Sequence, residues 1–308
     1  VINGRIDHAV LKARFAAAMH QAGGLVHDNT LQAVHAAGYR RRRSTLPRHA
    51  VAPLSDTLLN AAEIALATLP RRPCTDAERA GLRVISHRGE RGDPGIAENT
   101  LAAFAPLPDH GVWGLECDVR WTRDGEPILM HDPDTARVFA TPLQVADTDF
   151  RCLRQACPGL THLDELIERF AGRLHLMIEL KTAPRPAIDK PLSASLGGLE
   201  PARDFHLLSL APALFDHADG VPPSAWLPVA RTNVAAISRF ALTRGCAGMA
   251  GPFALIGRRR LAHHHASAQR VGVGFPRRAG LVTREAMRGV DWLFTNHAVA
   301  VAGMLRHA

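Results

Sequence analysis

The feature that most constrains the fold is a regular alternation that begins at Leu82. From there on, short runs rich in aliphatic and β-branched residues alternate with amphipathic stretches of helical spacing. Strands that alternate with helices in this way are typical of β-α units, in which consecutive strands lie parallel in one sheet. The sequence therefore predicts an α/β fold built on a parallel sheet.

Eight runs have the length and composition of strands. They are Leu82–His87, Trp113–Val119, Pro127–His131, Leu174–Leu180, His206–Leu210, Trp226–Ala230, Arg270–Phe275 and Trp292–Thr295. Helix signals fall between several of them: Thr161 and Asp164 form a capping box before a helix that Gly172 ends. Eight β-α units predict a closed TIM (β/α)8 barrel.

The first 80 residues have a different texture. Apolar spacing over residues 10–19 and 58–69 indicates helices, and glycine and proline breakers separate them. This part holds eleven Lys+Arg and six Asp+Glu, which is +5 of the formal net charge of +8. We expect a basic, helical N-terminal extension over residues 1–80 and a barrel domain over residues 81–308.

Composition limits the class of protein. A hydrophobic fraction of 46% and a charged fraction of 21% are those of an ordinary globular protein. No run approaches the roughly 18 apolar residues of a membrane span, and no secretory signal is visible, so we expect a cytoplasmic protein. Five cysteines without a C-x-x-C pair argue against a disulfide framework or a thiolate zinc site. Aromatic residues are scarce and no recognition motif accompanies the run Arg40–Arg43, so we expect no nucleic-acid partner.

Polar residues with catalytic potential recur at the ends of four consecutive predicted strands. The sequence there reads His87-Arg88-Gly89, Glu116-Cys117-Asp118, His131-Asp132 and Glu179-Leu180-Lys181. A parallel barrel gathers the carboxyl ends of its strands into one mouth, where barrel enzymes carry their catalytic groups. Residues two apart on a strand point to the same face, so both pairs of charged residues are directed one way.

The carboxylates of Glu116, Asp118 and Glu179 would then converge in an apolar surrounding. Their mutual repulsion would raise each pKa unless a cation neutralised them. Hard oxygen ligands suit Mg²⁺ or Ca²⁺ better than zinc, so we expect a divalent metal ion as cofactor. The alternative is a set of structural ion pairs with neighbouring arginine and lysine side chains.

Two histidines, His87 and His131, flank the three acids. Histidine titrates near neutral pH, so one imidazole can take a proton from a nucleophile while the other gives one to a leaving alkoxide. A single histidine at a strand end is more often structural. The pair beside carboxylates and cations favours an acid/base pair.

At this point the sequence resembles the glycerophosphodiester phosphodiesterase family, in the phosphatidylinositol phosphodiesterase-like TIM-barrel superfamily. The resemblance covers roughly residues 82 to 297 and is most specific in its first half. Its motifs, in order, are His87-Arg88-Gly89, Glu98-Asn99-Thr100, Glu116-x-Asp118, Asp124-Gly125, His131-Asp132 and Glu179-x-Lys181.

The resemblance implies a TIM-barrel enzyme that uses Ca²⁺ or Mg²⁺ to hydrolyse glycerophosphodiesters to sn-glycerol 3-phosphate and an alcohol. A small glycerophosphodiester is then the binding partner, and the oligomeric state stays open. By resemblance, the roles are metal binding for Glu116, Asp118 and Glu179, acid/base catalysis for His87 and His131, phosphate contact for Arg88 and Lys181, and a place near the site for Glu98.

The second half departs from the family pattern. The penultimate strand reads Val273-Gly274-Phe275-Pro276 where a Trp-Thr pair is usual, and Asn296 stands where an aspartate is common. Phe275 offers an apolar wall for the glycerol carbons but no indole donor, so the preferred diester stays open. Two alternatives remain: a phospholipase D-like enzyme acting on lysolipids or sphingolipids, and an inactive barrel that only binds phosphoglycerol compounds.

Overall fold

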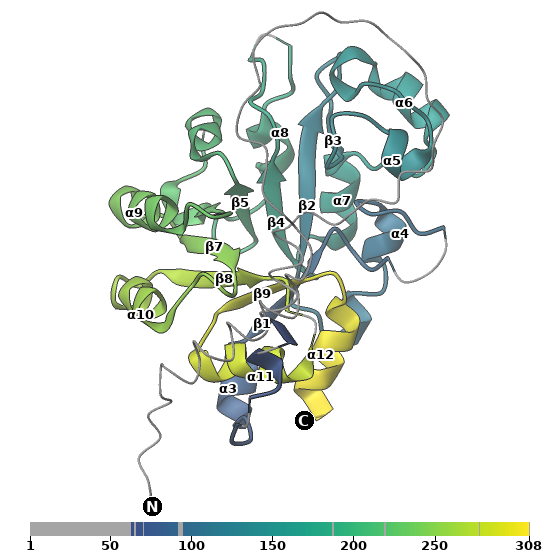
Figure 1. Cartoon of the computed structure of the whole chain (residues 1–308). Coiled ribbons are helices and arrows are strands. Elements are labelled where there is room, and N and C mark those ends of the chain that lie inside the picture. The colour runs from purple at the N-terminus through teal and green to yellow at the C-terminus, as the bar shows by residue number, and fades with distance from the viewer. Residues whose placement is uncertain are drawn as a thin grey trace, which may run out of the picture. The chain divides into compact units, whose positions relative to one another are not determined.

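The computed structural model describes residues 63–64, 66–69, 71–91, 95–186, 188–218, 220–276 and 278–307. The chain divides into two compact units, Val1–Thr68 and Leu69–Ala308. Only residues 63–64 and 66–68 of the first unit are described, so most of the predicted helical extension lies outside the described residues. The second unit holds the remaining described elements (Figure 1).

Eight parallel strands in the described part of the chain form a nearly closed barrel with alternating helices, a TIM barrel. Their order in the sheet is β6-β5-β4-β2-β1-β9-β8-β7, and a parallel bridge between Val229 and Ala250 links the two outer strands. The strands are β1 (Arg83–His87), β2 (Gly114–Trp121), β4 (His175–Leu180), β5 (Phe205–Ser209), β6 (Trp226–Pro228), β7 (Gly248–Pro252), β8 (Arg270–Gly274) and β9 (Trp292–Thr295).

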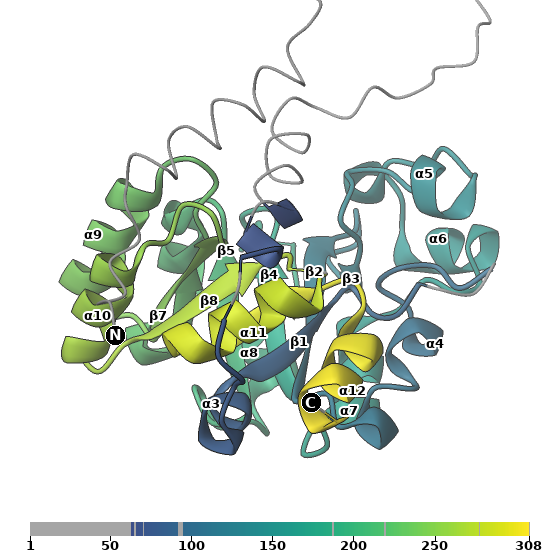
Figure 2. The same ribbon diagram turned by 60° about the horizontal axis from the view of Figure 1, so that its bottom comes forward.

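Helices alternate with these strands and surround the sheet (Figure 2). The α-helices are α3 (Asp76–Gly81), α4 (Leu101–Phe104), α5 (Ala136–Phe139), α6 (Phe150–Ala156), α7 (Leu163–Phe170), α8 (Leu192–Leu196), α9 (Val234–Arg244), α10 (Arg258–Ala266), α11 (Ala279–Arg288) and α12 (Ala298–His307). The 3₁₀ helices are η1 (Pro108–His110), η2 (Val145–Asp147), η3 (Pro212–His217) and η4 (Pro223–Ala225). No helix in these described segments is long and apolar enough to cross a membrane.

One predicted barrel strand is wrong. The run Pro127–His131 contains β3 (Pro127–Leu129), which pairs antiparallel with the end of β2 and lies off the barrel. The two strands form a hairpin whose turn includes Gly125 at φ +84°. Only five residues separate them, and a parallel crossover needs about a dozen or more. His131 therefore enters the site on the return arm of a hairpin.

The barrel strand that the sequence pattern missed is β7, with the sequence Gly-Met-Ala-Gly-Pro. Glycine, alanine and proline give no β signal, because strand propensity reflects branched and aromatic side chains that pack on a sheet. The small residues fit their surroundings: a Cβ on Gly248 would lie 1.7 Å from the Arg270 carbonyl oxygen. The requirement for glycine comes from close backbone approach, which local sequence does not reveal.

Two apolar clusters hold the site in place. The barrel core joins side chains from six strands: Ile85, Met177, Leu208, Leu227, Ala250, Trp292 and Phe294. A second cluster anchors the β2–β3 hairpin, where Ile128 and Met130 are buried against Leu153 and Leu160. Burying a side chain of this size stabilises the fold by about 1.5–3 kcal/mol. His131 is thus fixed by the apolar residue that precedes it.

Candidate active site

Three acidic side chains from two neighbouring strands meet in the barrel. Glu116 and Asp118 lie two residues apart on β2, and Asp118 pairs in register with Glu179 on β4. All three are buried, and one carboxylate oxygen from each lies within 4.8 Å of the other two. The predicted convergence of these carboxylates is therefore present.

Two cations neutralise part of this cluster. Lys181 Nζ lies 2.9 Å from Asp118 Oδ1 and 2.7 Å from Glu179 Oε1, and Arg88 Nε lies 3.0 Å from Asp118 Oδ2. Asn99 Nδ2 also donates to Asp118 Oδ2, at 2.8 Å. Burial raises the pKa of Asp118, but Arg88 and Lys181 outweigh it and hold that pKa below its ordinary value. Asp118 is therefore ionised.

Glu116 differs from Asp118, because both of its carboxylate oxygens are buried and neither accepts a hydrogen bond. Burial, followed by repulsion from Asp118 and Glu179, raises the pKa of Glu116 well above its ordinary range. A buried carboxylate without a donor is costly unless a cation lies beside it. The cluster has three carboxylates, and that of Glu116 has no hydrogen-bond partner. This arrangement fits the binding of a hard divalent cation better than it fits a set of completed ion pairs.

His87 ends β1 beside Glu116, and its protonation pattern follows from Asn296. Arg91 Nη2 donates to Asn296 Oδ1 at 2.6 Å, which identifies that atom as the amide oxygen. The same oxygen lies 2.7 Å from His87 Nδ1, so Nδ1 carries a proton and donates it. His87 Nε2 is then left with its lone pair, 3.8 Å from Glu116 Oε2. Burial, and then the charge of Arg88, lowers the pKa of His87 to about 4.

Phe275 covers the histidine of β1 from one side. Its ring centroid lies 4.5 Å from that of His87, and 44% of the residue is exposed. An apolar ring in this place limits the access of water to His87 and offers a surface for carbon atoms of a ligand.

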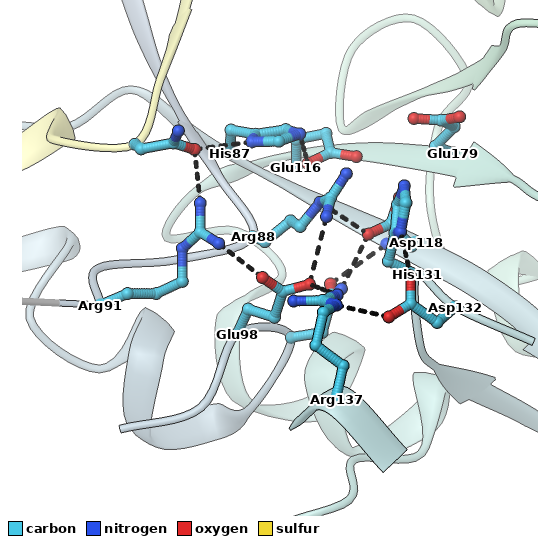
Figure 3. A network of polar contacts seen from close by, with 12 residues as sticks. His87, Arg88, Arg91, Glu98, Glu116, Asp118, His131, Asp132, Arg137 and Glu179 are labelled. Atoms are coloured by element: carbon cyan, nitrogen blue, oxygen red, sulfur yellow. Dashed lines mark hydrogen bonds and ion pairs between the residues drawn. The ribbon is translucent and has the colours of Figure 1, made fainter. Parts of the chain in front are cut away.

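Glu98 is the centre of an arginine network, which Figure 3 shows below His87. It contacts Arg88 at 3.1 Å, Arg91 at 2.5 Å and Arg137 at 2.6 Å. Burial raises the pKa of Glu98, but the hydrogen bond from Arg137 and the charges of all three arginines lower it overall. The network fixes Arg88, whose backbone has φ +61°, with its guanidinium over the acidic cluster.

His131 joins the site through its neighbour Asp132. His131 Nδ1 lies 2.7 Å from Asp132 Oδ1, and Arg137 Nε lies 2.5 Å from Asp132 Oδ2. Since a carboxylate only accepts, Nδ1 carries the proton of this hydrogen bond. Arg120 donates twice to the His131 carbonyl oxygen, at 3.0 and 2.9 Å. The imidazole is one-third exposed, far more than that of His87.

All nine residues singled out in the sequence lie in this region. Direct contacts join seven of them: His87, Arg88, Glu98, Glu116, Asp118, Glu179 and Lys181. His131 joins through Asp132 and Arg137, and Phe275 contacts His87. Sequence reasoning missed Arg91, Arg137 and the part played by Asn296. The two arginines follow the His-Arg-Gly and His-Asp motifs by a few residues, which was the available signal.

Comparisons with known proteins agree with this geometry. Residues 87–192 match the model of the Glycerophosphoryl diester phosphodiesterase family. Glycerophosphodiester phosphodiesterase 1 of Homo sapiens is 36% identical over 84 residues, which are 27% of this chain and 25% of that protein. Glycerophosphodiester phosphodiesterase of Caldanaerobacter subterraneus subsp. tengcongensis is 33% identical over 89 residues, which are 29% of this chain and 34% of that protein. The chain thus spans a quarter to a third of the length of these relatives.

Solved structures share the fold over a longer range. A glycerophosphodiester phosphodiesterase from Thermotoga maritima matches with a TM-score of 0.62 and 21% identity, over 72% of this chain and 98% of that chain. An Oleispira antarctica phosphodiesterase in complex with the product sn-glycerol-3-phosphate matches with a TM-score of 0.62 and 20% identity, over 73% and 96%. Fold and site together define a TIM-barrel protein with an acidic centre at its mouth. Over residues 87–192 the chain is similar to the glycerophosphodiester phosphodiesterase family.

Proposed function

We propose that this chain hydrolyses glycerophosphodiesters to sn-glycerol 3-phosphate and an alcohol. The observation that carries the proposal is the buried cluster of Glu116, Asp118 and Glu179 between two histidines. A phosphodiester anion needs positive charge on its non-bridging oxygens, because charge develops there in the transition state. Arg88 and Lys181 supply it from the protein.

The three carboxylates would hold the divalent ion, Mg²⁺ or Ca²⁺. When bound there, the ion supplies Lewis-acid stabilisation of the phosphoryl oxygens and neutralises the acids. A bound ion would stabilise the charged form of Glu116 most, since the oxygens of that side chain have no hydrogen-bond partner. The present role of Lys181 between Asp118 and Glu179 is compatible with a phosphate contact from the same position.

The surroundings of the two histidines differ in a way that suggests their roles. His87 donates to a neutral amide and lies beside Arg88, so it stays neutral and its Nε2 accepts a proton. His131 is more exposed and donates its Nδ1 hydrogen to the carboxylate of Asp132, which holds the ring in place. In the proposed reaction His87 takes the proton of the nucleophile, which is water or the substrate's own glycerol hydroxyl. The phosphorus–oxygen bond to the leaving alcohol breaks, and His131 protonates that alkoxide. Attack by water gives glycerol 3-phosphate directly, whereas attack by the glycerol hydroxyl gives a cyclic phosphate that water then opens with the two histidines in exchanged roles.

The test is an assay with glycerophosphocholine in Mg²⁺ or Ca²⁺ and again with a chelator, with separate detection of glycerol 3-phosphate and choline. We expect metal-dependent release of both. His87→Asn and His131→Asn should each lower kcat by roughly 10²–10⁴-fold with little change in KM. His110→Asn, an exposed histidine outside the site, is the matched control. Unchanged rates in both site variants would contradict the assignment.

The same assay with a lysophospholipid tests the second candidate, a phospholipase D-like activity. The half-exposed ring of Phe275 beside His87 favours it, because an acyl chain needs an apolar surface at the mouth. Activity on the lysolipid alone would establish that reading. Absence of hydrolysis of both substrates would mean a barrel that only binds.

A further inference from the structure

Within residues 81–308, positive charge is concentrated in one sector of the barrel. Residues 220–284 contain ten arginines and no lysine, aspartate or glutamate. Their charge of +10 exceeds the +8 of the whole chain, so the remaining residues sum to 8 − 10 = −2. The segment runs from η4 and β6 through α9, β7, α10 and β8 into α11, which are consecutive around the barrel. Figure 2 shows α9 and α10 together on one flank.

The densest part of this charge is the first turn of α10. Arg258 and Arg259 are exposed and Arg260 is half-buried, and none of the three forms an ion pair with any described residue. The start of a helix already carries positive charge from its backbone dipoles, so three guanidinium groups there repel it. A cavity of about 320 Å³ opens beside this turn, lined by Arg259, Arg260 and His263 and by Ser238 of α9. An external anion would offset the repulsion.

Two exposed apolar side chains lie in the loops that follow β7 and β8, the strands before and after α10 in the chain. Leu255 and Phe275 are each 44% exposed and follow β7 and β8, at the carboxyl ends of the strands. The two loops touch, because Phe253 N donates to the Gly274 carbonyl oxygen at 3.2 Å. Leu255 precedes Arg258 by three residues. Apolar tips and unpaired arginines thus form one surface on the mouth side of the barrel, which we call the basic rim: Leu255, Arg258–Arg260, His263 and Phe275.

We propose that the basic rim docks on an anionic phospholipid surface and turns the mouth of the barrel toward the lipid. Binding of this kind scales with the apolar area inserted among the headgroups plus attraction to anionic lipid. Phosphate headgroups offset the arginines of α10, and Leu255 with Phe275 enters the interface. A nucleic acid offers the same phosphate charge but would use stacking aromatics, whereas Leu255 is aliphatic. The proposal rests on the proposed function for the diester that the mouth would meet there.

The experiment is co-sedimentation of the full chain with vesicles of phosphatidylcholine alone, and with vesicles in which about one third of the lipid is phosphatidylglycerol. We expect binding to the anionic vesicles only, weakening as salt rises. The triple variant Arg258→Gln, Arg259→Gln, Arg260→Gln should bind on the order of 100-fold more weakly, at roughly five-fold per arginine. Leu255→Ser should weaken binding roughly ten-fold.

The matched control removes three exposed arginines from the opposite end of the barrel, before β4 and β5: Arg169→Gln, Arg173→Gln, Arg203→Gln. It loses the same charge and should bind like the unchanged protein. Equal losses in the two triple variants would overturn the proposal, because they would mean a response to net charge alone. So would an unaffected Leu255→Ser variant, or binding to duplex DNA but not to vesicles.

Hydrolysis of soluble glycerophosphocholine without vesicles separates this proposal from the proposed function. The rim triple variant should keep the unchanged protein's rate on that substrate, since none of its three positions contacts the acidic cluster. Vesicle binding by a protein that hydrolyses nothing would leave the docking surface standing and refute the function. Hydrolysis without vesicle binding would support the proposed function and refute the docking surface.

Discussion

Replacing Glu116 by glutamine should stabilise the metal-free protein, although the substitution removes a proposed metal ligand. Both oxygens of Glu116 are buried without a donor, and burial with the nearby Asp118 and Glu179 raises its pKa well above 4.5. The native site therefore holds a proton that the unfolded chain releases above pH 4.5. Stability from this group is full below pH 4.5 and is lost as the pH rises. At pH 7 the loss reaches at most about 3 kcal/mol, from 2.5 pH units at 1.36 kcal/mol each.

Glutamine has no charge to desolvate, and its amide nitrogen can donate to the neighbouring carboxylates. With a chelator at pH 7, Glu116→Gln should therefore raise the free energy of unfolding by up to about 3 kcal/mol, with no gain near pH 4.5. In saturating Mg²⁺ or Ca²⁺ the unchanged protein should instead have the higher free energy of unfolding. The unchanged protein gains about 2.7 kcal/mol at a hundred times Kd, and the variant has lost one anionic ligand.

Thermal and urea denaturation of both proteins, in chelator and in metal, measure these differences. A change of 1 kcal/mol corresponds to roughly 2–4 °C in Tm for a unit of this size. Glu168→Gln, at an exposed position of α7, is the control and should shift neither value. A variant less stable than the unchanged protein in chelator, or equally stabilised by metal, would refute the reasoning about Glu116.

Three further predictions test the surrounding structure. Asp132→Asn should lower kcat while leaving the fold intact by circular dichroism, because a neutral amide oxygen accepts the His131 Nδ1 hydrogen bond more weakly than a carboxylate does and holds the ring less firmly. Gly89→Ala should cost about 1–3 kcal/mol in urea unfolding, since its φ is +87° and the new Cβ would lie 2.5 Å from Ala103 Cβ; Gly303→Ala, with open space, should not. The buried pair His175–His206 should make the protein acid-sensitive. Burial lowers their pKa values to about 4 and about 3, so only the unfolded chain takes up protons below pH 6.5. Lowering the pH to 5 should reduce the free energy of unfolding, measured in urea, by about 2 kcal/mol per histidine. In the His206→Gln variant the reduction should be about half of that in the unchanged protein.

The acidic centre could be predicted because its information is local. Residues two apart on a strand share a face whatever the rest of the fold does, so Glu116 and Asp118 had to point together. Because parallel strands end at one mouth, Glu179 was also expected there, although the predicted strand Pro127–His131 stood between the two strands that the structure pairs directly. Lys181 follows from the same two-residue rule. These predictions needed only strand periodicity and the parallel sense of the sheet.

The direction of β3 was not a local property of its side chains. A short apolar run reads the same whether it belongs to a barrel strand or to the return arm of a hairpin. The deciding fact was the five-residue gap that contains Gly125, which leaves no room for a crossover helix. β7 was missed because its need for glycine at position 248 comes from the Arg270 backbone of β8, which the local sequence does not reveal. The total of eight was correct only because these two errors offset each other.

Arg91, Arg137 and Asn296 could not be assigned from the sequence, because their positions depend on long-range contacts. Asn296 lies 209 residues beyond His87 and yet accepts its Nδ1 hydrogen bond. Arg137 contacts both Glu98 and Asp132. These contacts require the β2–β3 hairpin, whose second strand was predicted as a barrel strand. The contacts of Arg137 thus depended on the one strand whose direction was wrong.

That hairpin also explains how one site can hold two histidines in different surroundings. His87 ends a barrel strand, where burial and the neutral amide of Asn296 favour an uncharged imidazole. The return arm of the hairpin instead leaves the His131 side chain one-third exposed, with its Nδ1 hydrogen-bonded to the carboxylate of Asp132. An acid and a base of the same residue type are therefore separated by the path of the backbone, and the position of β3 off the barrel is part of the proposed chemistry.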